Sequence, residues 1–186
     1  MAMTVDTARD LARTLVGEMG RRWEHVQAVG QRAEELGDCC DLPEHVIVAA
    51  WLHDVGYAPP LVSTHLHALD GAQFLSQEGA PDEVVRLVGW HTGAQFEADE
   101  RGLVAEWSII PEPQLVGLDA LTMIDLSTGP DGAPMVDTAR LAEILRRYSE
   151  DDPVHRAVER SAPALLAASR RAKDRLGLPQ DWPICS

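Results

Sequence analysis

The chain has 186 residues, of which 45% are hydrophobic and 25% are charged, so it can build one soluble domain with a substantial core. Its formal net charge of -14 excludes a broad basic surface, and we therefore expect neither a nucleic-acid polymer nor a membrane as partner. Because no apolar run could cross a bilayer and the N-terminus lacks the apolar region of a signal peptide, a cytoplasmic protein is expected.

Helical periodicity runs along most of the chain, and no segment reads as a convincing strand. Helices are predicted over residues 5–19, 21–36, 41–54, 68–78, 83–91, 114–126, 137–148 and 153–176, with some helix around 98–105. Gly37 is expected to end the second helix and Asp41 to cap the third. Two adjacent prolines mark 57–67 as a loop, and 127–134 is rich in turn residues. The sequence predicts an all-α, single-domain helical bundle over residues 1–186.

The three cysteines, Cys39, Cys40 and Cys185, show no CxxC spacing. Their odd number and the adjacent pair do not suit a disulfide framework or a zinc ribbon. We expect free thiols in a reducing compartment.

Titratable side chains lie on the apolar faces of three predicted helices. His25 precedes Val29 by four residues, and His53 follows Val46 by seven, so both imidazoles should point inward. Asp125 lies on a leucine stripe, whereas the nearby Asp119 lies off it. Burying such groups costs free energy unless they are paired.

Each residue taken alone fits a satisfied core histidine or a capping aspartate, but the set indicates a metal. Two imidazoles and two carboxylates from facing helices suit a divalent transition metal with positions left for water. Asp119 remains an alternative to Asp125 as the last ligand.

The order His25, His53-Asp54, Asp125 resembles the HD superfamily of metal-dependent phosphohydrolases. The sequence segments that carry the resemblance are "RRWEHVQAVGQRAEEL", "AAWLHDVGY", "HLHALDGAQFL", "VRLVGWHTGA" and "LDALTMIDLSTGPDG". They span roughly residues 21–130, and the helices over 137–176 follow them. The resemblance implies an HD-type helical bundle.

The resemblance also implies a ligand set. His25, His53, Asp54 and Asp125 match the metal-ligand positions. His67 and His91 match positions that hold a second ion in two-metal members, or that contact substrate or donate a proton in one-metal members. We expect one or two divalent ions per chain, drawn from Mn, Fe, Co, Ni, Zn and Mg. The sequence departs from the pattern of the family at two places. It has His91-Thr92 where some two-metal members have a double histidine, and Tyr57 where many members carry lysine.

The function implied by the resemblance is hydrolysis of a small phosphoester or a nucleotide by a metal-activated water. Asp54 is expected to bridge two ions or hold the water, and His67 or His91 to protonate the leaving oxygen. One alternative is a di-iron oxygenase of the HD type, which would contain two irons and consume oxygen. The other is a non-catalytic regulatory domain that binds a metal or nucleotide. Homo-oligomerisation is left open.

For several other polar residues the sequence does not indicate a specific function. Arg21, Arg22 and Arg101 can contact a phosphate, but solvated charges or ion pairs are the commoner role of such residues. The "STGPDG" loop lacks the spacing of a P-loop and is expected to be a simple turn. The remaining histidines are expected at the surface: His45, His65 and His155.

Overall fold

The computed structural model describes residues 3–184, and within them the chain forms helices joined by loops, with no strand. The helices, in chain order, are α1 (Val5–Val16), α2 (Arg21–Cys40), α3 (Glu44–Leu52), η1 (Val55–Tyr57), α4 (His67–Gln77), α5 (Asp82–Trp90), η2 (His91–Gly93), α6 (Ala94–Glu100), α7 (Val104–Trp107), α8 (Leu115–Leu126), α9 (Asp137–Arg147) and α10 (Pro153–Leu176). The predicted all-α fold is confirmed. No helix in the described part of the chain is long and apolar enough to cross a membrane.

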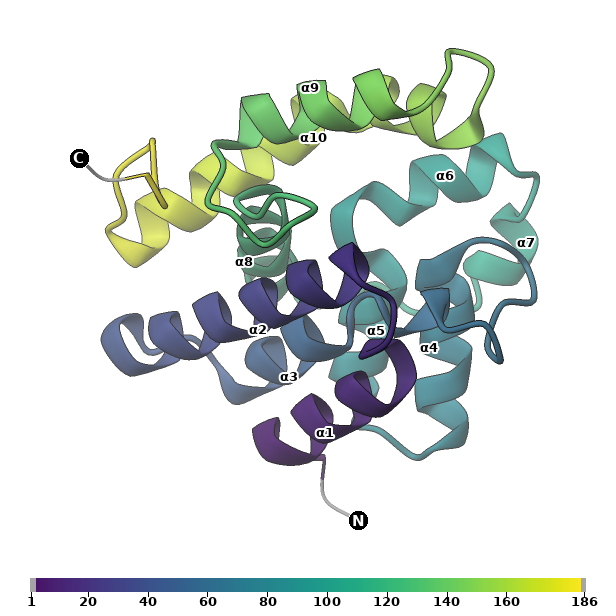
Figure 1. Ribbon diagram of the computed structural model, residues 1–186, viewed down its shortest axis with the longest axis horizontal. Helices are drawn as coiled ribbons and strands as arrows, with labels where there is room; N and C mark the ends of the chain where they lie inside the picture. The colour runs from purple at the N-terminus through teal and green to yellow at the C-terminus, as the bar shows by residue number, and fades with distance from the viewer. Residues whose placement is uncertain (1–2, 185–186) are drawn as a thin grey trace.

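The helices surround a central layer in which α2 and α3 lie side by side (Figure 1). Helix α1 packs beneath this pair, and α4 and α5 pack against each other beside it. Helix α8 contacts both α2 and α3. The long α10 packs over α8 and also lies alongside α9 at one edge of the molecule. The interior is therefore reached by side chains from α2, α3 and α8 together.

The core-facing stripes are those that the sequence periodicity indicates. Helix α3 is apolar on every side and every residue from Val46 to Leu52 is buried, which suits a helix enclosed by α1, α2, α5 and α8. Two tryptophans, Trp51 and Trp107, are also buried in the core. Cys39 and Cys40 are free, as expected, whereas Cys185 lies outside the described residues.

Two predicted helix boundaries are wrong. Helix α2 continues through Gly37 to Cys40, and α3 lies against it there: an added Cβ at Gly37 would lie 2.6 Å from Cδ1, the flexible end of the Ile47 side chain. The helix ends instead at Asp41, which adopts a left-handed conformation with φ 54°. Asp41 therefore closes α2, and Pro43 occupies the N-cap position of α3.

The helix expected around 98–105 is split into two pieces. Helix α6 ends at Glu100, and α7 begins at Val104. Gly102 lies between them with a φ of 69°, which interrupts the helical path.

The loop between η1 and α4 is held by one buried carboxylate. Asp70, inside α4, accepts hydrogen bonds from the backbone N–H of Ser63 and from both the N–H and the hydroxyl of Thr64. Buried polar groups require such partners. The chain that follows Asp54 is thereby fixed against the helix that carries His67.

Glycine at position 56 allows η1 to touch the first turn of α4. An added Cβ would lie 2.0 Å from the carbonyl oxygen of His67 and 2.6 Å from the backbone nitrogen of Gly71. Both neighbours are backbone atoms and cannot rotate away. Gly56 therefore sets the separation between Asp54 and His67.

We expect Gly56→Ala to destabilise the protein by about 3 kcal/mol, because overpacking against backbone displaces a helix. Gly79→Ala is the matched control: its Cβ would meet open space, and only the cost of its positive φ, about 1 kcal/mol, should remain. Urea unfolding followed by circular dichroism measures both values. Equal losses in the two variants would contradict the close-packing role of Gly56.

Candidate metal centre

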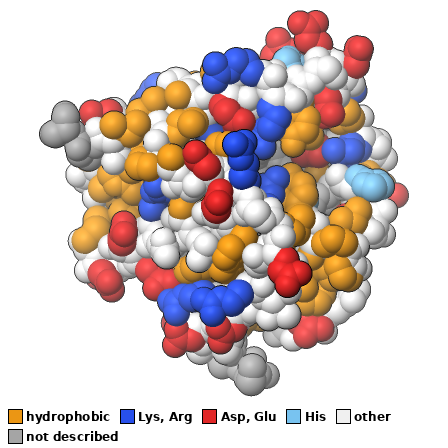
Figure 2. Space-filling model, in the orientation of Figure 1, with side chains coloured by type: hydrophobic (Ala, Val, Ile, Leu, Met, Phe, Trp, Pro, Cys, Tyr) orange, Lys and Arg blue, Asp and Glu red, His pale blue; other side chains and the backbone are white. Residues whose placement is uncertain are grey.

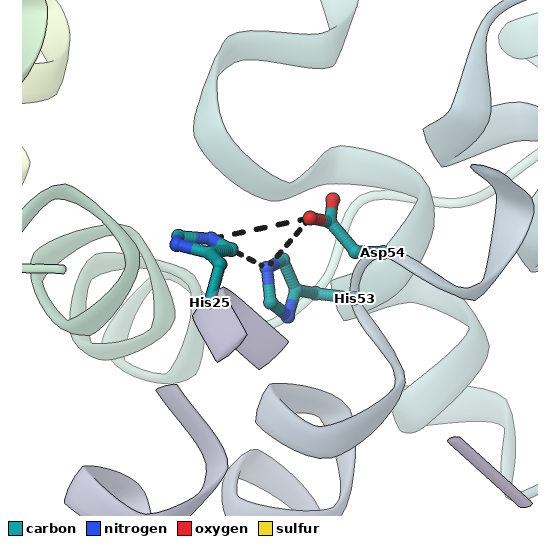
Figure 3. Close-up of side chains that lie close together, drawn as sticks. All are labelled: His25, His53 and Asp54. Atoms are coloured by element: carbon teal, nitrogen blue, oxygen red, sulfur yellow. Dashed lines mark hydrogen bonds and ion pairs between the residues drawn. The ribbon is translucent and has the colours of Figure 1, made fainter. Parts of the chain in front are cut away.

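Three side chains from α2 and from the residues after α3 converge at the centre of the bundle (Figure 3). The Nε2 atoms of His25 and His53 are 3.3 Å apart. Oδ2 of Asp54 lies 3.9 Å from the first and 3.5 Å from the second. All three residues are buried. Their three ligand atoms thus face one point from three directions.

The other oxygen of Asp54 faces a second pair of histidines. Its Oδ1 lies 3.4 Å from Nε2 of His67 and 3.9 Å from Nε2 of His91, and these two nitrogens are 3.1 Å apart. Asp54, His67 and His91 therefore form a second group able to hold an ion. Asp54 belongs to both groups, with one oxygen directed to each.

Asp125 joins the first group and Asp119 does not. Oδ1 of Asp125 lies 3.0 Å from Nε2 of His25, while Thr92 donates a hydrogen bond to its Oδ2. Asp119 points away from the cluster, and its carboxylate is paired with Arg171 on α10. Of the two aspartates left open by the sequence, Asp125 is the one that reaches the histidines.

Backbone carbonyls fix the orientation of three of the imidazoles. Nδ1 of His53 lies 2.7 Å from the carbonyl oxygen of Ala50, and Nδ1 of His91 lies within hydrogen-bond distance of the carbonyl of Val88. Nδ1 of His25 lies 3.0 Å from the carbonyl of Gly129. A carbonyl can only accept, so each ring donates its Nδ1–H there, and a neutral ring then has a bare lone pair at Nε2.

This arrangement fits a cation. Lone pairs on nitrogens about 3 Å apart repel each other, whereas a divalent ion about 2.1 Å from each nitrogen would accept both of them. A backbone acceptor on the opposite ring nitrogen is also the usual support of a metal-binding histidine. The six residues present therefore suit one or two divalent ions.

The sequence comparison decides the family. Residues 22–124, more than half of the chain, match the HD domain family. The chain belongs to the HD domain family. The match begins three residues before His25 and ends one residue before Asp125, so it contains five of the six clustered residues.

One further relative is more distant. A stretch of 77 residues, 41% of this chain, is 34% identical to a tRNA (cytidine(56)-2'-O)-methyltransferase of Picrophilus torridus and covers 22% of that protein. The chain thus spans about a fifth of the relative's length, and the similarity does not carry the activity in its name to this HD domain. No solved structure matches the chain.

Charged neighbours determine the protonation of the two aspartates. Burial alone would raise the pKa of Asp54, but the Arg22 guanidinium and the surrounding imidazoles outweigh it and hold this pKa well below the usual range. Burial also acts to raise the pKa of Asp125, but the neighbouring His25 and His53 outweigh it and leave that pKa lowered. Both carboxylates are ionised at neutral pH and available as ligands.

The second pair of histidines is neutral at pH 7. Burial is the main cause of the lowered pKa of His67 and of His91; Asp54 opposes it in both rings, and Asp125 does so at His91. A neutral imidazole is a ligand, while a proton donor must first be protonated. Of the two roles that the sequence leaves open for these residues, the geometry and the pKa shifts favour that of ligand.

A cavity of about 90 Å³ opens over the cluster. Tyr57 lies on its wall between two neighbours: the His67 ring is stacked 4.2 Å from the Tyr57 ring, and the Arg22 guanidinium lies 3.8 Å from the ring centroid. Arg22 also donates to Asp54. Of the arginines singled out in the sequence, Arg101 instead pairs with Glu97.

The histidines outside the cluster have other environments. His65 is exposed, as expected, whereas His45 and His155 are half-buried. Nδ1 of His155 lies 3.0 Å from the carbonyl oxygen of Tyr148, so this residue ties α10 to the end of α9. The "STGPDG" loop is more than a turn, because it supplies the Gly129 carbonyl that orients His25.

Sequence reasoning missed Arg140 and Arg147, which line the same cavity from α9. Arg140 is buried. The signal in the sequence is that Arg140 precedes Ile144 by four residues and therefore lies on the apolar stripe of its helix. An arginine on such a stripe needs an anionic partner.

We expect the protein purified without chelator to contain about two divalent ions per chain, since the chain offers two three-residue groups. His91→Ala should lower the content to about one ion, and His53→Ala should empty the first group. His65→Ala, a change at an exposed histidine, should leave the content unchanged. Inductively coupled plasma mass spectrometry provides the measurement, and a full metal content in both cluster variants would refute the assignment.

Stability of the metal-free protein should fall on acidification. Because the folded pKa values of His67 and His91 lie below their ordinary value of 6.5, the unfolded chain binds more protons below that pH. Their contribution is fully present above about pH 6.5 and is lost as the pH falls, by up to about 1.4 kcal/mol per pH unit for each histidine.

Urea unfolding of chelator-treated protein between pH 7.5 and 5.5 measures this slope. His91→Gln should flatten it, and His65→Gln should not. A free energy of unfolding that stays constant over the whole range would contradict the prediction.

Proposed function

We propose that this HD domain is a metal-dependent phosphohydrolase that cleaves a small phosphoester or a nucleotide. The observation that carries the proposal is the convergence of two ligand groups on the two oxygens of Asp54. Bound divalent ions supply two things to such a reaction: a water of lowered pKa and a polarised phosphoryl oxygen. Membership of the HD domain family supports the same chemistry.

His25, His53, Asp54 and Asp125 would hold the first ion, and Asp54, His67 and His91 the second. The Gly129 carbonyl and the Thr92 hydroxyl keep His25 and Asp125 in place. Fixed ligands of this kind are what a preorganised site requires.

The proton for the leaving oxygen needs a group other than the two neutral histidines. Glu97 lines the cavity, and burial raises its pKa despite the opposing Arg101. A carboxyl group with a raised pKa is suited to general-acid catalysis. We assign Glu97 to this step.

A small phosphorylated substrate fits the charge of the chain better than a nucleic-acid polymer. The formal net charge is -14, so a polyanion would be repelled over most of the surface. In the cavity over the cluster three arginines, Arg22, Arg140 and Arg147, balance three carboxylates, so bound divalent ions would give it a net positive charge.

The second candidate is a di-iron oxygenase. The same observation favours it, because a carboxylate shared by two ligand groups places two ions side by side. The two functions are separated by metal identity and by co-substrate, since only the oxygenase needs iron and molecular oxygen. A purely regulatory domain is the third reading, and in that case removing Asp54 would affect binding or stability without affecting turnover.

The test is release of inorganic phosphate from a panel of small phosphomonoesters and nucleotides with added Mn, Co, Ni, Zn, Mg or Fe. Asp54→Asn should lower kcat by about a thousandfold, because the shared ligand is lost. Asp10→Asn, which changes an exposed aspartate, should have no effect. Oxygen consumption by the iron-loaded protein without phosphate release would favour the oxygenase instead.

A further inference from the structure

A second cavity, of about 350 Å³, adjoins the one over the metal centre. The two share Arg22, His25, Tyr57, Arg140 and Arg147 as lining residues. The inner cavity of about 90 Å³ is too small for a whole substrate, since pockets for small molecules usually hold a few hundred Å³. A substrate with its ester at the metal centre must therefore extend into the outer cavity.

The outer cavity is strongly basic in an otherwise acidic protein. Four arginines line it, against one acidic residue, Glu143: they are Arg21, Arg22, Arg140 and Arg147. Figure 2 shows blue side chains gathered between α9 and the start of α2, with red ones among them. The charge excess of this wall favours an anionic group of the ligand.

Among the residues that line the outer cavity, Arg140 gives the strongest evidence for a binding subsite. Its side chain is only 6% exposed, and its Nε is buried without a hydrogen-bond partner. Within residues 3–184 the one ion-pair partner of this guanidinium is Glu143, and Glu143 is shared with Arg147 at 3.3 Å. A guanidinium that lines a cavity and shares one carboxylate with a second arginine keeps charge and donors for an anion that binds there.

The tyrosine that lines the outer cavity is already covered. Tyr57 has the His67 ring on one face and the Arg22 guanidinium on the other, both in contact with the ring. A nucleobase cannot stack on a ring whose two faces are occupied. The outer cavity thus offers charge rather than stacking.

We infer that the cavity between α2 and α9 is an anion subsite in which Arg140 and Arg147 hold a second anionic group, a phosphate or a carboxylate, on the part of the substrate that leaves. This inference rests on the proposed function for the position of the ester, and it narrows the substrate class from phosphoesters in general to small, non-nucleoside phosphoesters with two anionic groups. Both residues lie on α9, beyond the segment that matches the family.

Isothermal titration calorimetry on the metal-containing protein tests the subsite with four probes. Glycerol 3-phosphate has one anionic group, 3-phosphoglycerate adds a carboxylate, fructose 1,6-bisphosphate adds a phosphate, and adenosine 5'-monophosphate adds a base. We expect at least one two-anion probe to bind about tenfold tighter than glycerol 3-phosphate, as a charge-assisted guanidinium contact would give. Which of the two binds tighter identifies the second group as carboxylate or phosphate.

Arg147→Gln and Arg140→Lys should each remove most of this preference while the metal content stays unchanged. Arg140→Lys keeps the charge but lacks the planar fork, so it separates recognition from simple attraction. Arg146→Gln is the matched control, because Arg146 is an exposed neighbour on the same helix and the charge change is the same.

Any one of three results would overturn the inference. The first is equal affinity for one-anion and two-anion probes, and the second is tighter binding of the nucleotide than of both two-anion probes. The third is an equal loss of the two-anion preference in Arg146→Gln. These outcomes are independent of turnover. A protein that prefers two-anion probes but releases no phosphate would retain the subsite and lose the proposed function. A protein that hydrolyses glycerol 3-phosphate but binds neither 3-phosphoglycerate nor fructose 1,6-bisphosphate more tightly would retain the function and lose the subsite.

Discussion

The geometry of the site depends on hydrogen bonds from three buried imidazoles to backbone carbonyls. His25, His53 and His91 each donate Nδ1–H to such an oxygen, so each directs its Nε2 to the centre of the bundle. The acceptors belong to the helices and to one loop, which are rigid parts of the fold. The fold therefore imposes a cluster of lone pairs, and a cation is the ligand that such a cluster stabilises.

Asp54 connects the two halves of this cluster and balances its charge. Its two oxygens face different histidine pairs, and Arg22 donates to it from the start of α2. Ligand positions on both sides thus depend on the placement of one residue. Gly56 maintains that placement, since only a glycine allows η1 to lie against the first turn of α4.

The functional residues divide between two parts of the chain. The histidines lie within residues 22–124, the segment shared with the HD domain family, and they determine which chemistry is available. The arginines that line the cavity from α9 lie outside that segment, next to Glu143. Under the inference above, the shared core carries out the reaction and the C-terminal helices select the substrate.

Much of the fold and most of the cluster could be read from the sequence, because both follow from local patterns. Apolar residues at the helical period predict the helices, and a histidine or aspartate on an apolar stripe must point inward, as His25, His53 and Asp125 do. The end of α2 at Asp41 and not at Gly37 could not be predicted, because a left-handed conformation at a residue other than glycine is uncommon and leaves no clear pattern in the sequence. The tertiary structure alone separated Asp125 from Asp119, since an arginine of the distant α10 pairs with Asp119. It alone brought His67 and His91 to the second oxygen of Asp54, and α9 to the mouth of the cavity, because such proximity results from how the helices pack and not from the spacing of residues along the chain.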